Sequence, residues 1–280
     1  MKRLSNCGGV LVFLGALFWS LNSPLVKYLS IDPLLIILLR SVIAGIVLLP
    51  FLRPKHLNWN PWILVYLISY ACLTLGVVIS LSMTAAPIAT GMQYSSIIWF
   101  FLCDLWAVRR IRMKALIPAV VVFTGVVLFM CSGDGQSSDP LGNLIALTEG
   151  VSFAFLTISS RKSAGSSPVG LVALANWFTA LLVLPFIPQI ESQLSAMSAQ
   201  EWGIMLILGT VQVGLGYTFY NMGVLRVSAQ RVSIIALWEV ILGTLWVMLF
   251  LHEYPNRMVW IGFAVILTGM VLDALWTKAK

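Results

Sequence analysis

Long apolar stretches, each close to the length needed to cross a lipid bilayer, follow one another along almost the whole sequence. A bilayer core of about 30 Å is spanned by about 20 helical residues. Ten stretches have about this length, at residues 8–28, 33–52, 62–83, 87–107, 114–132, 140–160, 168–187, 202–223, 227–250 and 257–276. The chain is 60% hydrophobic and 10% charged, whereas a soluble domain is about 45–50% apolar and about 25% charged. The pattern predicts an all-α membrane protein with ten transmembrane helices.

Short polar breaks separate these stretches. They include Asp32-Pro33, the segment 53–62, the basic segment 109–114 and the polar segment 132–140 near the middle of the chain. None of them is long enough to hold a soluble domain. The first stretch is longer than the apolar region of a signal peptide, which has about 7–15 residues, so we expect it to be retained as the first helix.

The distribution of basic residues predicts an orientation. If the N-terminus is cytoplasmic, fourteen of the 17 lysines and arginines fall in cytoplasmic segments, while Lys27 and Arg257 are external and Arg40 lies within a helix. Basic residues favour the cytoplasmic side of membrane helices. We therefore expect a multi-pass protein of the inner or plasma membrane with both termini cytoplasmic. This orientation and contact with anionic lipids explain the net charge of +7, so nucleic-acid binding is not expected.

The second half of the chain repeats parts of the first half in the same order. VVVFTGVVL at 120–128 resembles AVILTGMVL at 264–272, an offset of 144 residues. Pro50-Phe51 and Pro185-Phe186 end the second and seventh stretches. Because five helices per half is an odd number, the second copy must cross the membrane in the opposite sense, as in alternating-access transporters with inverted repeats. Chance likeness among membrane helices is the alternative.

Several of these segments resemble the EamA type of the drug/metabolite transporter superfamily. GALFWSLNSPLVKYL at 15–29 is similar to the first helix of that family, and LLRSVIAGIVLLP at 38–50 is similar to its second helix. Residues 224–253 resemble its ninth helix, and the helices that contain Gly125 and Gly269 complete the match. The resemblance covers essentially the whole chain.

The resemblance implies two inverted five-helix repeats around a central cavity, which we expect at residues 1–133 and 134–280. It also implies secondary transport of small metabolites, very often export of amino acids or similar compounds. Two positions depart from the family. Arg109 stands where a glutamate usually ends the fourth helix, and Val240 stands where proline often follows the residue corresponding to Glu239, so the ninth helix lacks a proline that could kink it.

Ionisable residues within the apolar stretches are candidates for function, because a charge inside a membrane is costly and usually faces a cavity or a partner. Glu239 is a candidate to bind a proton, another coupling ion or a substrate amine; a structural hydrogen bond or a pair with Arg40 is the alternative. Arg40 lies about 10 Å deep at 1.5 Å per residue, and a structural role is favoured for it. Glu149 either pairs with Arg40 or lines the cavity. Asp104 is expected to form salt bridges with the basic cluster that follows it.

Aromatic and amide side chains inside the stretches are candidates to bind substrate. Tyr94 and Trp238 occupy equivalent positions at the offset of 144, near the middle of the fourth and ninth stretches. Aromatic belts of membrane proteins lie at the headgroups. This pair could instead form walls of a cavity for a flat or cationic substrate, with ordinary packing as the alternative. The predicted substrate-binding residues are Trp19, Asn22, Tyr94, Trp99, Asn176, Tyr217, Trp238 and Glu239.

Several kinds of chemistry are not expected from this sequence. It has no GxxxxGK[ST] phosphate loop and no HExxH motif, and His56 and His252 fall on opposite membrane faces in the predicted topology. The four cysteines form no CxxC pair, so a metal site is not expected. An intramembrane enzyme acting on lipid would need a cytoplasmic cluster of acid and base groups. We therefore expect no cofactor and no enzymatic activity.

These observations together predict a secondary active transporter that exports amino acids or related compounds through a midplane cavity by alternating access. Protons or another ion are expected to drive it. Import or exchange of a larger nucleotide-linked or phosphorylated metabolite is an alternative, but it would need clustered cationic residues, and only Arg40 and Lys27 are present. A non-transporting membrane scaffold is a further alternative. The sequence leaves the oligomeric state open.

Overall fold

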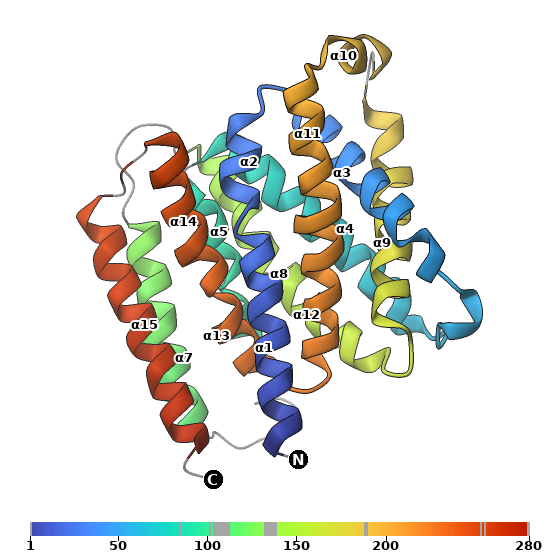
Figure 1. Cartoon of the computed structure of the whole chain (residues 1–280). Coiled ribbons are helices and arrows are strands. Elements are labelled where there is room, and N and C mark those ends of the chain that lie inside the picture. The colour runs from blue at the N-terminus through green and yellow to red at the C-terminus, as the bar shows by residue number, and fades with distance from the viewer. Residues whose placement is uncertain are drawn as a thin grey trace.

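The computed structural model is a bundle of helices that run side by side between two ends of the molecule (Figure 1). It describes residues 2–84, 86–100, 102, 113–131, 139–187, 190–252, 254 and 256–278, and it contains no strand within these ranges. Seven helical segments are long and apolar enough to cross a membrane: Gly8–Tyr28, Pro33–Phe51, Pro61–Met83, Pro140–Lys162, Pro168–Phe186, Ala199–Val224 and Arg231–Leu251. Shorter apolar helices cover Leu116–Leu128 and Arg257–Leu272. The all-α membrane fold predicted from the sequence is confirmed.

The elements of the first half are α1 (Lys2–Trp19), α2 (Asn22–Tyr28), α3 (Pro33–Leu48), η1 (Leu49–Phe51), η2 (Pro54–His56), α4 (Pro61–Met83), α5 (Ala86–Gln93) and α7 (Met113–Met130). Those of the second half are α8 (Pro140–Lys162), α9 (Pro168–Val183), η3 (Leu184–Phe186), α10 (Ile190–Ala196), α11 (Ala199–Ile207), η4 (Leu208–Leu215), α12 (Gly216–Val224), α13 (Ala229–Ala236), α14 (Trp238–Leu251) and α15 (Arg257–Lys278). The fourth predicted stretch is described only up to residue 100 and at 102, so Asp104 and Arg109 lie outside the described residues.

Four of the long helices begin in the same way. A polar residue caps the helix and a proline follows it, as Asp32 does for α3, Asn60 for α4, Asp139 for α8 and Ser167 for α9. The side-chain oxygen accepts a hydrogen bond from a backbone N–H of the first turn, for example Leu34 N to Asp32 Oδ1 at 2.7 Å. Proline fits the first helical position because its missing N–H would have no partner there. These local signals explain why the predicted starts of these helices agree with the structure to within one residue.

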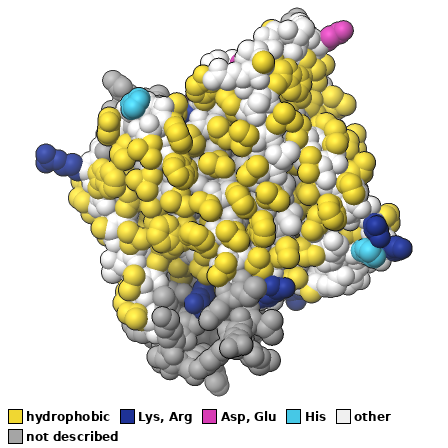
Figure 2. Space-filling model, viewed as in Figure 1, with side chains coloured by type: hydrophobic (Ala, Val, Ile, Leu, Met, Phe, Trp, Pro, Cys, Tyr) yellow, Lys and Arg dark blue, Asp and Glu magenta, His cyan; other side chains and the backbone are white. Residues whose placement is uncertain are grey.

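The surface is apolar between two polar ends (Figure 2). We call the end where α1 begins and α15 ends the terminal end, and the other the opposite end (Figure 1). Large apolar side chains between the ends are exposed, as in Ile68 at 48% and Leu181 at 67%, which suits contact with lipid rather than water. The described charges of the terminal end are basic: Arg53, Lys55, Arg161, Lys162, Arg226 and Arg231. Those of the opposite end are mixed: Lys27, Asp32, Asp139, Glu191, Glu201 and Arg257.

The two halves build corresponding helices from corresponding signals. Helices α3 and α9 each have 16 residues, each start with proline, and each continue into a 3-10 turn made of Leu-Pro-Phe. The two helices lie against each other. The repeated Pro-Phe of the sequence is therefore a repeated helix end in the structure.

Helices α7 and α15 also lie side by side (Figure 1), and their glycines allow a close approach. A Cβ atom on Gly125 would lie 2.6 Å from Cγ1 of Ile266 and 2.9 Å from the carbonyl oxygen of Gly262. A Cβ atom on Gly269 would lie 2.5 Å from Cγ2 of Val122 and 3.1 Å from the carbonyl oxygen of Pro118. Each contact of one helix thus has its counterpart, 144 residues away, in the other. This reciprocal packing is what a two-fold relation between inverted repeats requires.

Three of the predicted stretches are interrupted near their middle, and a fourth changes its helix type there. A break at residues 20–21 separates α1 from α2, a turn at residues 94–95 follows α5, and Leu237 separates α13 from α14. Between α11 and α12 the chain forms the π-helix η4. Pro24 accounts for the first break, because it cannot donate a hydrogen bond to the carbonyl group of Ser20. The break at Leu237 forms without a proline. The ninth stretch is therefore interrupted even though Val240 replaces the proline that is common in the family.

Candidate functional site

Glu239 lies directly after the break at Leu237 and is 4% exposed. Its Oε2 atom is 2.6 Å from the hydroxyl oxygen of Tyr94 and 3.4 Å from Nε2 of Gln93. The hydroxyl oxygen of Tyr94 also lies 2.7 Å from the carbonyl oxygen of Ala236. A hydroxyl group has one proton to donate. The Tyr94 hydroxyl group therefore shares this proton between Oε2 of Glu239 and the carbonyl oxygen of Ala236.

The interruptions at 94–95 and at Leu237 therefore meet inside the molecule. The hydroxyl groups of Ser96 and Ser233 are also 3.0 Å apart. Helix ends leave backbone carbonyl and N–H groups without partners inside their own helix, and here the hydroxyl group of Tyr94 binds one of them, the carbonyl group of Ala236. This is the arrangement of discontinuous helices that forms substrate and ion sites in inverted-repeat transporters.

Glu149 of α8 is a second buried carboxyl group, with no exposed surface. Its Oε1 atom accepts a hydrogen bond of 2.7 Å from the hydroxyl group of Ser80 on α4. Its Oε2 atom has no hydrogen-bond partner. The side chain fits against α4 because residue 76 is glycine: a Cβ atom there would lie 2.7 Å from Cγ of Glu149.

Arg40 of α3 is 2% exposed. Nη1 donates to Oδ1 of Asn22 at 3.0 Å, and Nη2 donates to the carbonyl oxygen of Thr74 at 2.7 Å. It forms no salt bridge with a described acidic residue; Glu149 and Glu239 have the partners given above. The ion pairs considered for Arg40 from the sequence are therefore not formed in this structure.

A band of aromatic rings joins the region of Arg40 to that of Glu239. The ring centroids of Tyr70 and Tyr217 are 4.6 Å apart, as are those of Tyr217 and Trp19. Trp19 is 6.0 Å from Phe153, and Phe153 is 5.7 Å from Tyr94. All five rings are buried. The band comes from α1, α4, α8, α12 and the turn after α5, so it links the two halves of the chain.

Toward the terminal end a hydrogen-bonded network closes the interior. Asn221 donates from Nδ2 to the hydroxyl oxygen of Tyr66 at 2.6 Å and accepts from Ser160 at 2.8 Å. The hydroxyl groups of Thr157 and Tyr220 are 2.5 Å apart. These bonds tie α4, α8 and α12 together below the aromatic band.

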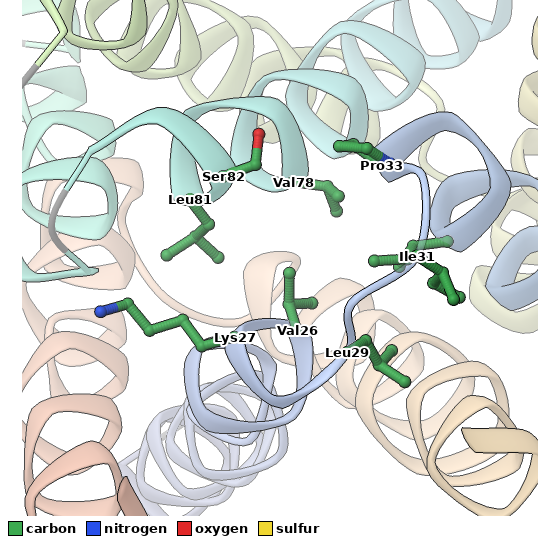
Figure 3. A pocket seen from close by; sticks show the side chains of 9 residues that line it. Val26, Lys27, Leu29, Ile31, Pro33, Val78, Leu81 and Ser82 are labelled. Atoms are coloured by element: carbon green, nitrogen blue, oxygen red, sulfur yellow. The ribbon is translucent and has the colours of Figure 1, made fainter. Parts of the chain in front are cut away.

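Toward the opposite end there is a cavity of about 260 Å³. Figure 3 shows Val26 of α2 facing Val78 and Leu81 of α4 across it, with Lys27 at its edge. The cavity is lined by Val26, Lys27, Leu29, Ile31, Pro33, Ile36, Val78, Leu81 and Ser82. The structure is thus hollowed toward the opposite end and closed by polar contacts toward the terminal end.

The structure brings together six of the eight predicted substrate-binding residues in the buried interior: Trp19, Asn22, Tyr94, Asn176, Tyr217 and Glu239. Asn176 donates from Nδ2 to the carbonyl oxygen of Val172 at 2.8 Å, and its Oδ1 atom has no partner. The other two lie apart. Trp99 is 40% exposed, and Trp238 is half-buried with its ring edge-on to Phe13 at 5.8 Å. Tyr94 and Trp238, considered as two walls of a cavity, have different neighbours: the ring of Tyr94 lies 5.7 Å from that of Phe153, whereas the ring of Trp238 lies beside that of Phe13.

The predicted set did not include Tyr66, Tyr70 and Thr74 of α4. They lie four residues apart and therefore on one face of the helix, and each contacts a residue of the interior. Polar residues at a regular spacing of four within an otherwise apolar stretch are the signal that could have found them.

The fold and this polar interior define the chain as a multi-pass membrane protein of the transporter class. The description "EamA-like transporter family" matches residues 6–131 and 140–273, and the chain belongs to that family. Its members carry small molecules across membranes and are not enzymes. The resemblance noted in the sequence is confirmed.

Several named proteins are similar over almost their full length. The "Biotin transporter" of Salmonella typhimurium strain LT2 is 24% identical over 286 residues, which cover 96% of this chain and 94% of the relative. The "Biotin transporter" of Escherichia coli strain K12 is 24% identical over 91% of this chain and 87% of its own length. The "Uncharacterized transporter YwfM" of Bacillus subtilis strain 168 is 25% identical over 98% and 96%. A solved structure described as "Crystal structure of protein" has a TM-score of 0.78 over 97% of this chain and 98% of that chain at 19% identity, which shows a shared fold.

Proposed function

We propose that this chain is a secondary active transporter that exports amino acids or related small metabolites by alternating access. The observation that carries the proposal is Glu239, a buried carboxyl group at a helix break of the second half, hydrogen-bonded to Tyr94 at a helix break of the first half. A titratable group shared by the two halves can couple its protonation to their relative position. The repeats at residues 1–133 and 134–280 are the two bodies that rock in this proposal.

The two ends of the interior support the same proposal. Alternating access needs one end closed while the other admits solute. The bonds of Asn221 close the terminal end, and the cavity beside Lys27 opens the opposite end. With both termini cytoplasmic in the cell membrane, as the basic terminal end supports, this state faces outward. Protons are the proposed coupling ion.

A second candidate substrate is biotin. It is favoured by the relatives that are named biotin transporters, which align over most of both chains. Larger phosphorylated metabolites have less support, because Arg40 is the one arginine or lysine that the structure describes as buried.

Counterflow in proteoliposomes tests the proposal. Vesicles loaded with one unlabelled compound are diluted into the same compound in labelled form, using leucine, phenylalanine, threonine, biotin, a sugar phosphate and a nucleotide in turn. Transient accumulation of a labelled amino acid is expected. Accumulation of biotin alone would replace the amino-acid assignment, and accumulation of none would favour the scaffold hypothesis. Fusions of a cytoplasm-active reporter to either terminus test the orientation.

A further inference from the structure

Arg40 presents a positive charge for which the described part of the chain supplies no negative partner. Two of its nitrogens have neutral acceptors, Asn22 and the carbonyl group of Thr74, and its Nε atom has none. A buried guanidinium group is strongly unfavourable unless an anion and further hydrogen bonds compensate it.

The polar atoms around Arg40 that lack partners are mostly donors. They are Nε of Arg40 and Nδ2 of Asn22, together with the hydroxyl group of Tyr70, which also lies beside the unpartnered acceptor Oδ1 of Asn176. The acceptor of Asn22, Oδ1, is already bonded to Arg40. Buried polar groups normally have hydrogen-bond partners. What Arg40 and Asn22 lack is therefore an acceptor, and the charge of Arg40 makes a negative acceptor the best one.

Printed contacts and short chain segments connect these side chains in a ring. Asn22 bonds to Arg40, and Arg40 bonds to the backbone of Thr74, one turn from Tyr70. The ring of Tyr70 lies beside that of Tyr217, whose ring lies beside that of Trp19, and only the break at residues 20–21 separates Trp19 from Asn22. One side of the ring is cationic and the other is aromatic, which suits an anion with an apolar or flat body.

The cavity at the opposite end lies one helical turn from this ring. Three of its lining residues lie four positions from a member of the ring on the same helix: Val26 from Asn22, Ile36 from Arg40, and Val78 from Thr74. Residues four apart in a helix lie on the same face one turn from each other. The ring is therefore one helical turn deeper than the cavity wall shown in Figure 3, on all three helices that surround the cavity.

The charge balance selects among anions. A carboxylate carries one charge and two coplanar oxygens, which match the fork of one guanidinium group. A phosphate dianion would need more than one buried cation, and Arg40 is the one that the described residues supply. Lys27 lies at the edge of the cavity, where its charge favours the approach of an anion.

We propose that Arg40, Asn22 and Tyr70 bind the carboxylate group of the transported solute, which reaches them through the cavity beside Lys27. This inference rests on the proposed function, since it names the substrate class of the same transporter. The ring accounts for both candidate substrates, because amino acids and biotin each carry a carboxylate. It places the recognised group at Arg40 and leaves Glu239 to the coupling ion.

Thermal unfolding of the purified protein in detergent tests the binding step without transport. The probes are acids with neutralised counterparts: biotin and its methyl ester, phenylalanine and phenylalaninamide, indole-3-acetate and indole-3-acetamide. At least one acid is expected to raise the unfolding temperature by about 5 °C at saturation, and its counterpart is expected to have no effect. A counterpart that stabilises as well as its acid, or no response to any acid, would overturn the inference.

Asn22→Asp is the decisive variant, because it places a carboxylate of the chain itself within hydrogen-bond distance of Arg40. It is expected to raise the unfolding temperature without ligand and to abolish the response to the acid. Asn143→Asp is the matched control, since Asn143 also uses its Oδ1 atom as an acceptor, from Thr84 at 3.0 Å, and should keep the response. Asn22→Asp that still responds to the acid would contradict the assignment to Arg40.

The outcome for carboxylate binding is separable from the outcome for transport. An acid that stabilises the protein but shows no counterflow would leave this inference standing and contradict the transporter proposal. A methyl ester that enters counterflow as well as its acid would support the transporter proposal and contradict the inference that the carboxylate is recognised. Arg40→Lys should weaken binding of the acid by about tenfold or more, because a lysine lacks the planar fork.

Discussion

The broken helices of the interior and the α7–α15 pair solve the problem of a membrane helix in opposite ways. In the pair, glycines let the backbones approach, and the hydroxyl groups of Thr124 and Thr268 bond to their own helices at 2.9 and 2.8 Å. In the interior, Arg40, Glu149 and Asn22 keep polar atoms without partners. Within the described residues, the threonines of the pair have their hydrogen bonds, whereas the interior retains buried polar atoms without a partner. We therefore expect the α7–α15 pair to contribute mainly to stability and the interior to contribute mainly to transport.

The largest expected effect is on coupling, through Glu239→Gln. Glutamine can replace the hydrogen bonds of a protonated glutamate but cannot gain or lose a proton. Substrate exchange in counterflow should persist, while accumulation driven by a pH gradient should be abolished. Glu191→Gln, at an exposed acid of α10, should leave both unchanged. Gradient-driven accumulation in Glu239→Gln would contradict the proposed role of Glu239 in coupling, and with it the contrast between the interior and the α7–α15 pair.

Gly125→Ala tests the other side of the comparison. The added methyl group would meet Ile266 and the backbone of Gly262, and such overpacking costs about 1–3 kcal/mol of unfolding free energy. The unfolding temperature should fall, while counterflow per folded molecule should stay the same. Gly203→Ala is the control, because a Cβ atom there has no neighbour within 4 Å. A loss of transport without a loss of stability would assign the pair a direct part in transport.

Tyr94→Phe should lower both the stability and the coupling of transport. Tyr94 belongs to the interior, and its hydroxyl group has hydrogen-bond partners that the variant would lose. Removing the hydroxyl group leaves Glu239 and the carbonyl group of Ala236 with one partner fewer, at a cost of about 1–3 kcal/mol. The measurement is the unfolding temperature together with gradient-driven accumulation. Tyr254→Phe, at a tyrosine that is 74% exposed, should change neither.

Trp99→Leu should have the smallest effect. Trp99 was predicted to bind substrate, but it is 40% exposed and stands outside the aromatic band. A surface substitution of this kind changes stability by about 0.5 kcal/mol or less. Acid-dependent stabilisation should be retained, whereas Trp19→Leu should reduce it. An equal loss of acid-dependent stabilisation in the two variants would indicate that Trp99 does bind the substrate.

Most of the fold could be predicted because its signals are local or periodic. Asp32-Pro33 and Asp139-Pro140 mark helix starts, and the apolar lengths mark the spans. The interruptions were harder. Leu237 has no proline or glycine beside it, and the break there depends on how α13 and α14 meet Tyr94 and Gln93.

The candidate site was predictable residue by residue but not in its pairings. Glu239 and Arg40 stand out because a charge in an apolar stretch is costly. Their partners do not: Asn22 is 18 positions from Arg40, and Tyr94 is 145 positions from Glu239. The sequence also allowed a pairing of Arg40 with Glu149. In the structure Glu149 instead accepts a hydrogen bond from Ser80.

The sequence by itself determined that this chain is a helical membrane protein, how many times its apolar stretches recur, and which residues are too polar to face lipid. These properties follow from hydrophobicity and spacing along the chain. Only the tertiary structure decided which polar groups satisfy one another and which are left without a partner. The reason is that hydrogen bonds depend on distances of a few ångströms between helices far apart in the sequence, and the folding of the two halves against each other sets those distances.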